Sequence, residues 1–191
     1  SGLVQKGQPN GRAATVKELD EIKAAFVEGA VTAQAIGASG IEIHCAHGYF
    51  LDLFLWPETN LRTDQYGGPS IAFRVRYPAE IVAAVRDAVG EDFIISFRFS
   101  QWKEVDFDAK VVSTPEQLKV MVNILEHAGV DIFHVSTRQI LEPEWPEHSK
   151  MGLAGWTKSF TEKTVIAVGS VGLDTDLMSN LFGKQAEPTG S

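Results

Sequence analysis

The sequence predicts an α/β fold with a parallel sheet, because four short apolar segments alternate with segments of helical periodicity. We expect the strands to begin near residues 41, 93, 130 and 164, at spacings of 52, 37 and 34 residues. The last two spacings suit one strand and one helix each, whereas the first includes an insertion of about 15 residues. Short strands that are apolar throughout favour parallel pairing with helices on the sheet faces. Two architectures fit this order: a doubly wound sheet, or part of a (β/α)8 barrel.

Capping signals place the helices of the first half of the chain. Thr15 and Glu18 form a capping box at the start of the first helix, and Gly37 ends it. Gly90 is a suitable residue to end the second helix. The expected elements are a loop over 1–14, a helix over 16–36, a strand over 41–43, a long irregular segment over 45–70 and a helix over 72–89.

Similar signals place the elements of the second half. Thr114 and Pro115, with Gln117 three residues after the threonine, predict a helix start, and Gly129 predicts its end. Asp174 is a candidate cap for a last helix. The expected elements are strands over 93–99, 130–135 and 165–168, helices over 115–127 and 174–182, and a polar tail over 184–191.

Composition narrows the class of protein. The chain has 191 residues, with 17 Lys and Arg against 25 Asp and Glu, and its formal charge of −8 argues against a nucleic-acid partner. One cysteine excludes a disulfide framework or a Cys-based metal cluster from this chain alone. No apolar run of 18 residues and no signal-peptide pattern occur, so we expect a cytoplasmic protein with no membrane partner. The length lies just below the roughly 200 residues of the smallest complete (β/α)8 barrels.

Polar and glycine residues follow each predicted strand, at the edge where both architectures carry their chemistry. The candidate residues are His44, His47 and Tyr49 after the first strand, Arg98 at the end of the second, Ser136 to Arg138 after the third, and Gly169 and Ser170 after the fourth.

The residue types at this edge allow more than one interpretation. His44 and His47, three residues apart and at most one helical turn from each other, can point at one small group, or form a metal site, or be hydrogen-bonded core residues. Tyr49 adds a hydroxyl suited to protonating a carbanion-like centre. Arg98 either forms an internal ion pair with Glu42 or donates to an anionic or carbonyl-rich cofactor edge.

The glycine-rich turn after the fourth strand also has two interpretations. Gly169 and Ser170, ahead of a predicted helix start, suit a phosphate group because backbone N–H groups and the helix dipole favour an anion there. A tight turn that uses glycine for conformational reasons alone explains the same residues.

A long motif around the histidines resembles the Old Yellow Enzyme family of FMN-dependent NADH:flavin oxidoreductases and ene-reductases. The resemblance extends from the helix at residue 16 to the segment 165–172. Its motif consists of Glu-Ile-His-Cys-Ala-His-Gly-Tyr at 42–49, Leu51-Asp52, Phe54-Leu55, Pro57, Thr59-Asn60, Arg62-Thr63-Asp64 and Tyr66-Gly67-Gly68.

The resemblance implies a fold, cofactors and site roles. The fold is a TIM barrel with FMN at its carboxyl-end mouth, and the four predicted strands correspond to barrel strands 4 to 7. NADH or NADPH reduces FMN, whose N5 delivers hydride to an activated alkene such as an enone or nitroalkene. On this resemblance His44 and His47 bind the activating oxygen of the small-molecule substrate, and Tyr49 protonates the carbon beside the activating group. Arg98 lies at the flavin edge, and Gly169 with Ser170 forms the first half of the phosphate loop.

The resemblance covers only the middle of the family's barrel, because strands 1 to 3 and strand 8 have no counterpart here. We therefore expect one partial TIM barrel over 1–191, made of a lead-in loop and helix (1–40), four βα units (41–183) and a polar tail (184–191). We expect the 191-residue piece to be a fragment of an FMN-dependent oxidoreductase and to be inactive alone. Its candidate macromolecular partners are a complementing barrel fragment and further copies of the same chain. The alternative is a non-catalytic half-barrel that self-associates into a homo-oligomer, because an open parallel sheet exposes two edges.

Overall fold

The structure is a computed structural model that describes residues 3–5, 8–9, 11–173, 182–183 and 187–188. Its centre is a parallel sheet in the order β3-β4-β5-β6, the order in which the strands occur along the chain. The four predicted strands are therefore present. Their bounds are Gly40–His47 (β3), Ile94–Lys103 (β4), Ile132–Ser136 (β5) and Thr164–Val168 (β6).

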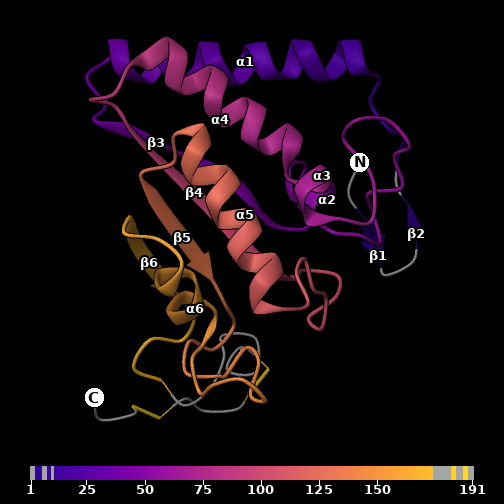
Figure 1. Cartoon of the computed structure of the whole chain (residues 1–191), viewed down its shortest axis with the longest axis vertical. Helices are drawn as coiled ribbons and strands as arrows, with labels where there is room; N and C mark the ends of the chain where they lie inside the picture. Colours follow the sequence, from indigo (N-terminus) through magenta and orange to yellow (C-terminus); the bar gives the residue numbers. More distant parts are fainter. Residues whose placement is uncertain (1–2, 6–7, 10, 174–181, 184–186, 189–191) are drawn as a thin grey trace.

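The helices cover one face of this sheet (Figure 1). A doubly wound sheet carries helices on both faces, whereas a barrel carries them only on its outer side, so this arrangement favours the partial (β/α)8 barrel. The helices are α1 (Val16–Ala35), α2 (Asp52–Leu55), α3 (Ile71–Arg74), α4 (Arg76–Val89), α5 (Pro115–Ala128) and α6 (Leu153–Ser159).

The predicted caps explain the long helices. Thr15 and Glu18 make the full capping box of α1, with each side chain accepting from the other's backbone N–H. Thr114 caps α5 by accepting from the N–H of Gln117, and Gly129 ends that helix in the left-handed conformation. Because caps satisfy the end groups that a helix leaves open, these boundaries were readable from the sequence.

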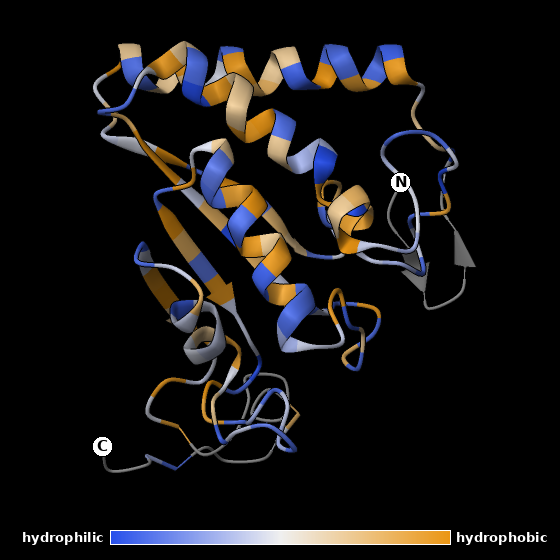
Figure 2. Cartoon of the chain, in the orientation of Figure 1, coloured by the Kyte–Doolittle hydropathy of each residue, from blue (hydrophilic) through white to orange (hydrophobic). Residues whose placement is uncertain are grey.

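The core lies between the sheet and its helices, where apolar positions of both face each other (Figure 2). Ile43, Phe97 and Phe133 occupy one row across three strands, and all three are buried. The next row, on the opposite face, consists of His44, Arg98, His134 and Ile166. We call the face that carries this second row the inner face, since it corresponds to the interior side of a barrel. Ile166 there is 42% exposed.

Several predicted boundaries are wrong. The first 14 residues include a small antiparallel pair, β1 (Leu3–Gln5) with β2 (Gln8–Pro9), rather than only a loop. Strand β3 continues through His47 instead of ending at residue 43, and β4 extends to Lys103. In both strands the pairing continues through polar residues, because the neighbouring strand supplies hydrogen-bond partners for their backbone. Hydropathy reports only side-chain polarity and so does not predict where this pairing ends.

Two further differences concern helices. The helix expected over 72–89 is divided at Val75 into α3 and α4. Helix α6 lies between β5 and β6, where the sequence predicted no helix. The helix expected from residue 174 lies outside the described residues. Among the residues described, no helix is both long and apolar enough to cross a membrane.

Candidate active site

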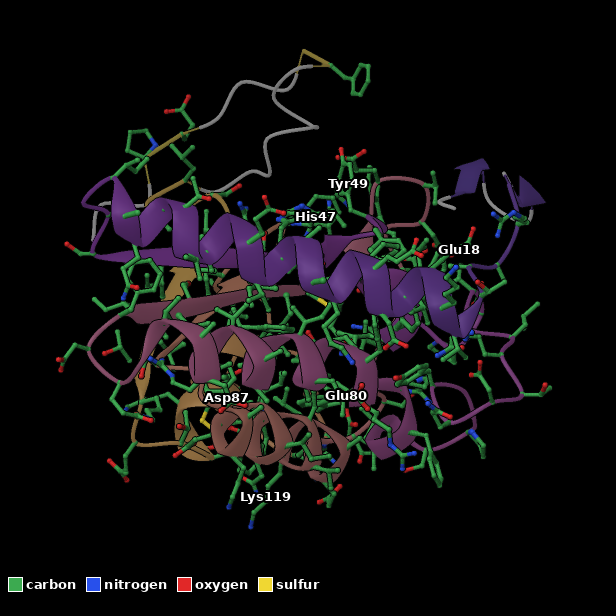
Figure 3. The ribbon with its side chains drawn as sticks, turned by 90° about the horizontal axis from the view of Figure 1, so that it is seen from above. Glu18, His47, Tyr49, Glu80, Asp87 and Lys119 are labelled. Carbon is green, nitrogen blue, oxygen red and sulfur yellow. The ribbon has the colours of Figure 1, made fainter. Side chains whose placement is uncertain are left out.

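The predicted site residues of β3, β4 and β5 meet at the carboxyl end of the sheet. His44 lies opposite Arg98 in the β3–β4 register, and Ser136 ends β5. Figure 3 shows His47 and Tyr49 beside each other, on the side of the molecule away from α4 and α5. In that view Glu80 and Asp87 label α4, and Lys119 labels α5. The rings of His44 and His47 are 5.5 Å apart, and those of His44 and Tyr49 are 5.4 Å apart.

His47 does not lie on a helical turn with His44, as its spacing suggested. It is the last residue of β3 and has a φ of +62°, in the left-handed region that non-glycine residues rarely adopt. Gly48 follows with a φ of +87°, and the Tyr49 N–H donates to the Ala46 carbonyl across the pair. Two positive φ values at the centre of a four-residue turn are typical of type I′. This turn reverses the strand alternation and brings the ring of His47 back towards His44.

The ring of His47 is held on two sides. Its Nε2 lies 2.8 Å from the Ser136 hydroxyl, which accepts a 3.3 Å hydrogen bond from Arg98 Nη2. The indole of Trp102 stacks on the ring, with centroids 4.3 Å apart. Because Arg98 can only donate, the Ser136 hydrogen is available for Nε2, and a neutral His47 then carries its proton on Nδ1.

Both histidines favour the neutral form. Burial, followed by the charge of Arg98, lowers the pKa of His47 to about 4 and also lowers the pKa of His44. At neutral pH each ring therefore has one N–H donor and no charge. Two neutral donors beside each other suit a carbonyl or nitro oxygen that gains electron density during a reaction.

Tyr49 lies at the open side of the site. Its side chain is 52% exposed, and its Oη donates a 3.1 Å hydrogen bond to a carboxylate oxygen of Glu104. That hydrogen bond raises the pKa of Tyr49, so the phenol keeps its proton at neutral pH. The hydroxyl is thus a proton source that a molecule entering from solvent can reach.

Arg98 has a buried N–H group that the described part of the chain leaves without an acceptor. This group is the Nε of its guanidinium. The predicted alternative, an ion pair with Glu42, is not formed, because the Glu42 carboxylate accepts instead from Ser96 and contacts His134 Nδ1 at 2.8 Å. A buried guanidinium N–H without an acceptor costs free energy, so this atom fits the carbonyl oxygens or ring nitrogens of a bound cofactor.

The turn after β6 packs closely on the loop after β5. A Cβ atom on Gly169 would lie 2.3 Å from the Thr137 carbonyl oxygen, and the φ of Gly169 is +144°. Ser170 also has a positive φ, of +50°, and its hydroxyl donates to the Arg138 carbonyl. These residues therefore lie at the same end of the sheet as Arg98, as predicted, and the close approach explains the glycine.

Comparisons with known proteins identify the family of this chain. Residues 4–185 match the sequence profile described as the NADH:flavin oxidoreductase / NADH oxidase family. The chain belongs to this family. Its fold is accordingly part of a TIM barrel, as the Old Yellow Enzyme resemblance implied.

Two relatives and one solved structure illustrate the match. An NADH oxidase of Thermoanaerobacter brockii is 40% identical over 84% of this chain and 25% of its own length. A cinnamate reductase of Clostridium sporogenes is 34% identical over 74% of this chain and 23% of its own length. The structure of morphinone reductase in complex with tetrahydroNAD superposes with a TM-score of 0.67 at 25% identity, and covers 85% of this chain and 42% of that one. The chain thus spans less than half the length of these members of the family.

Several residues around the site were not identified from the sequence. Trp102, Lys103 and Glu104 lie beyond the strand end that hydropathy predicted, yet all three contact the turn that carries His47 or the Tyr49 side chain. Asp52 was noted only as part of the motif, although it is completely buried and accepts from the Gly48 N–H. One sequence signal could have identified these residues. It is the polar run that directly continues the apolar strand and contains Lys103, together with an acidic residue, Asp52, in the motif.

The remaining alternatives for the site can be compared with the geometry. Among the residues that the structure describes, no cluster of three His, Cys, Asp or Glu side chains has the arrangement of a metal site. Cys45 is completely buried, and burial raises the pKa of its thiol well above the usual value. A buried neutral thiol of this kind is a packing residue.

Proposed function

We propose that the protein carrying this sequence is an FMN-dependent oxidoreductase that reduces activated alkenes with NADH or NADPH. The observation that carries the proposal is the juxtaposition of two neutral histidines, an accessible tyrosine hydroxyl and a buried arginine with an unpartnered N–H. The cinnamate reductase among the relatives supports the substrate class, since cinnamate contains a conjugated alkene.

The residues present fit a flavin at the inner face of the sheet. Arg98 would hold the carbonyl edge of the ring through the buried N–H that has no protein acceptor. Gly169 and Ser170 would contact the phosphate, because the turn lies at the same carboxyl end. When bound, FMN supplies the hydride for the β-carbon of the alkene.

The chain's own side chains would bind and protonate the substrate. His44 and His47 donate hydrogen bonds to the activating carbonyl or nitro oxygen, and these bonds strengthen as negative charge develops there. Tyr49 Oη transfers its proton to the carbon next to the activating group, so that one O–H bond breaks and one C–H bond forms. The phenolate regains a proton from water at the exposed side of the ring.

The experiment is a comparison of Tyr49→Phe with the unaltered, FMN-loaded protein. We expect alkene reduction to fall by about 10²- to 10⁴-fold, the usual contribution of a general acid, while reduction of the flavin by NADH changes little. The two half-reactions are followed separately by the flavin absorbance near 450 nm in a stopped-flow instrument. Unchanged alkene reduction would remove Tyr49 from the proton-donor role.

A second candidate function, self-association through the open edges of the sheet, is supported by β6, an edge strand on which Thr164, Ile166 and Ala167 are exposed. Sedimentation of the purified chain distinguishes it from the first. A stable oligomer without bound flavin supports the structural role, whereas a monomer that binds FMN supports the enzyme.

A further inference from the structure

The turn that carries His47 has each of its backbone N–H groups paired. The His47 N–H donates to Ser100 Oγ at 3.0 Å, and the Tyr49 N–H donates to the Ala46 carbonyl at 3.1 Å. The Gly48 N–H between them donates to the Asp52 carboxylate at 2.7 Å. The turn itself offers no acceptor for the Gly48 N–H, so Asp52 is the group that satisfies it.

Asp52 in turn depends on Lys103. The Lys103 ammonium lies 2.6 Å and 2.9 Å from the two carboxylate oxygens and donates to the Ser100 carbonyl at 3.1 Å. Both side chains are 0% exposed. Lys103 lies opposite His47 in the sheet register, and the next residue, Glu104, donates its N–H to the His47 carbonyl.

Stability is a poor explanation for this ion pair. Removing two charges completely from water costs more than their attraction returns in many proteins, and apolar pairs of similar volume are often as stable. The pKa shifts of both groups agree with the cost of removing the charges from water. Burial raises the pKa of Asp52 to about 6 and lowers the pKa of Lys103. Both shifts favour the neutral forms.

We propose that Asp52 is a positioning residue, which accepts the Gly48 N–H and thereby keeps His47 and Tyr49 in the orientation that the substrate requires, and that Lys103 serves to neutralise the buried charge of Asp52. The inference rests on the proposed function for its kinetic consequence. Its structural part, that Asp52 holds the left-handed turn at His47 and Gly48, is independent of the reaction.

Two double variants separate positioning from charge. Asp52→Asn with Lys103→Met removes both charges but keeps a side-chain carbonyl oxygen for the Gly48 N–H. Asp52→Leu with Lys103→Met removes the charges and that acceptor at similar volume. The two variants therefore differ chiefly in whether the Gly48 N–H has an acceptor.

The kinetic expectation follows from this difference. In the FMN-loaded protein, the Asn/Met variant should reduce an enone within about threefold of the unaltered protein, whereas the Leu/Met variant should lose at least about tenfold in kcat, the scale of a misplaced catalytic group. Flavin content should be equal in all three. Lys23→Met, which removes an ion pair between α1 and α4, is the control and should leave kcat unchanged.

A second readout does not need the reaction. Hydrogen exchange of the Gly48 amide, followed by NMR in labelled protein, should be slow in the unaltered protein and the Asn/Met variant and at least about tenfold faster in the Leu/Met variant. If the Leu/Met variant does not fold, Asp52→Ala with Lys103→Met replaces it with the same expectations.

Each outcome has a defined meaning. Equal kcat and equal Gly48 exchange in the two double variants would overturn the proposal, and so would equal losses in both, since the acceptor would then not matter. If the unaltered protein reduces no alkene, the proposed function fails, while the Gly48 exchange still decides whether Asp52 holds the turn.

Discussion

A lysine–aspartate ion pair and a glutamate–histidine contact beside the sheet differ in how completely this chain covers them. Asp52 and Lys103, behind the turn at His47, are both 0% exposed. Glu42 and His134, on the inner face, are 36% and 18% exposed and are 2.8 Å apart. The difference teaches that this chain alone encloses the residues that hold the turn at His47. It leaves the inner face, where Arg98 lies, open to solvent.

Lys103→Met should produce the largest loss of stability. It leaves the Asp52 carboxylate completely buried without a cation, which typically costs about 3–5 kcal/mol of unfolding free energy. Urea denaturation at pH 7 measures this loss, and Asp52→Leu with Lys103→Met should recover most of it. A loss of unfolding free energy as small as that from breaking a solvent-exposed salt bridge would show that water reaches Asp52.

Gly169→Ala should have the next largest effect, because the new Cβ would lie 2.3 Å from the Thr137 carbonyl oxygen at a φ of +144°. We expect a loss of about 2 kcal/mol, typical of overpacking, measured as a lower midpoint of thermal unfolding. Gly172→Ala is the matched control. Gly172 also has a positive φ, of +73°, but no atom of the described residues lies within 4 Å of a Cβ there, and its loss should be about 1 kcal/mol. Equal losses would mean that backbone conformation, and not the contact with the β5 loop, requires Gly169.

Trp102→Leu tests the cover over His47. Losing the stacked ring should cost about 1 kcal/mol, and the pKa of His47 should rise from about 4 towards its usual value because water then reaches the imidazole. A pKa lowered by folding means that the unfolded chain binds the proton more readily. Stability therefore falls as the pH decreases from about 6.5 to about 4, and this decrease should be smaller in the variant.

NMR titration of the histidine ring protons measures the His47 pKa directly. An unchanged pKa in Trp102→Leu would show that Arg98 and the rest of the site, without the indole, keep His47 neutral.

Glu42→Gln should have the smallest effect, below about 1 kcal/mol at pH 7, because the pair is partly exposed. Burial by itself would raise the pKa of Glu42, but hydrogen bonds from His134 and Ser96 outweigh it and lower that pKa. The ionised Glu42 side chain thus stabilises the folded state above its unfolded pKa of about 4.5. This stabilisation is lost as the pH falls through the lower pKa of the folded state. The difference in stability between variant and unaltered protein should therefore shrink as the pH falls below about 4.5, and a difference that does not change with pH would assign it to packing.

The sequence by itself determined the class of fold and the first candidate residues of the site. Short apolar strands, capping residues such as Thr15 and Thr114, and the glycines that end α1, α4 and α5 are local signals, and they placed the strands and the long helices in order. The motif around His44, His47 and Tyr49 indicated the family because many specific residues recur at fixed spacing.

Only the tertiary structure decided how these residues are held. The left-handed conformation of His47, the stacking of Trp102 and the burial of Asp52 against Lys103 each depend on two segments about 50 residues apart in the chain. Hydropathy places lysine and aspartate at the surface, since the cost of burying each is recovered only when the other is beside it. That pairing arises from the register of β3 with β4, which no local pattern in either strand specifies.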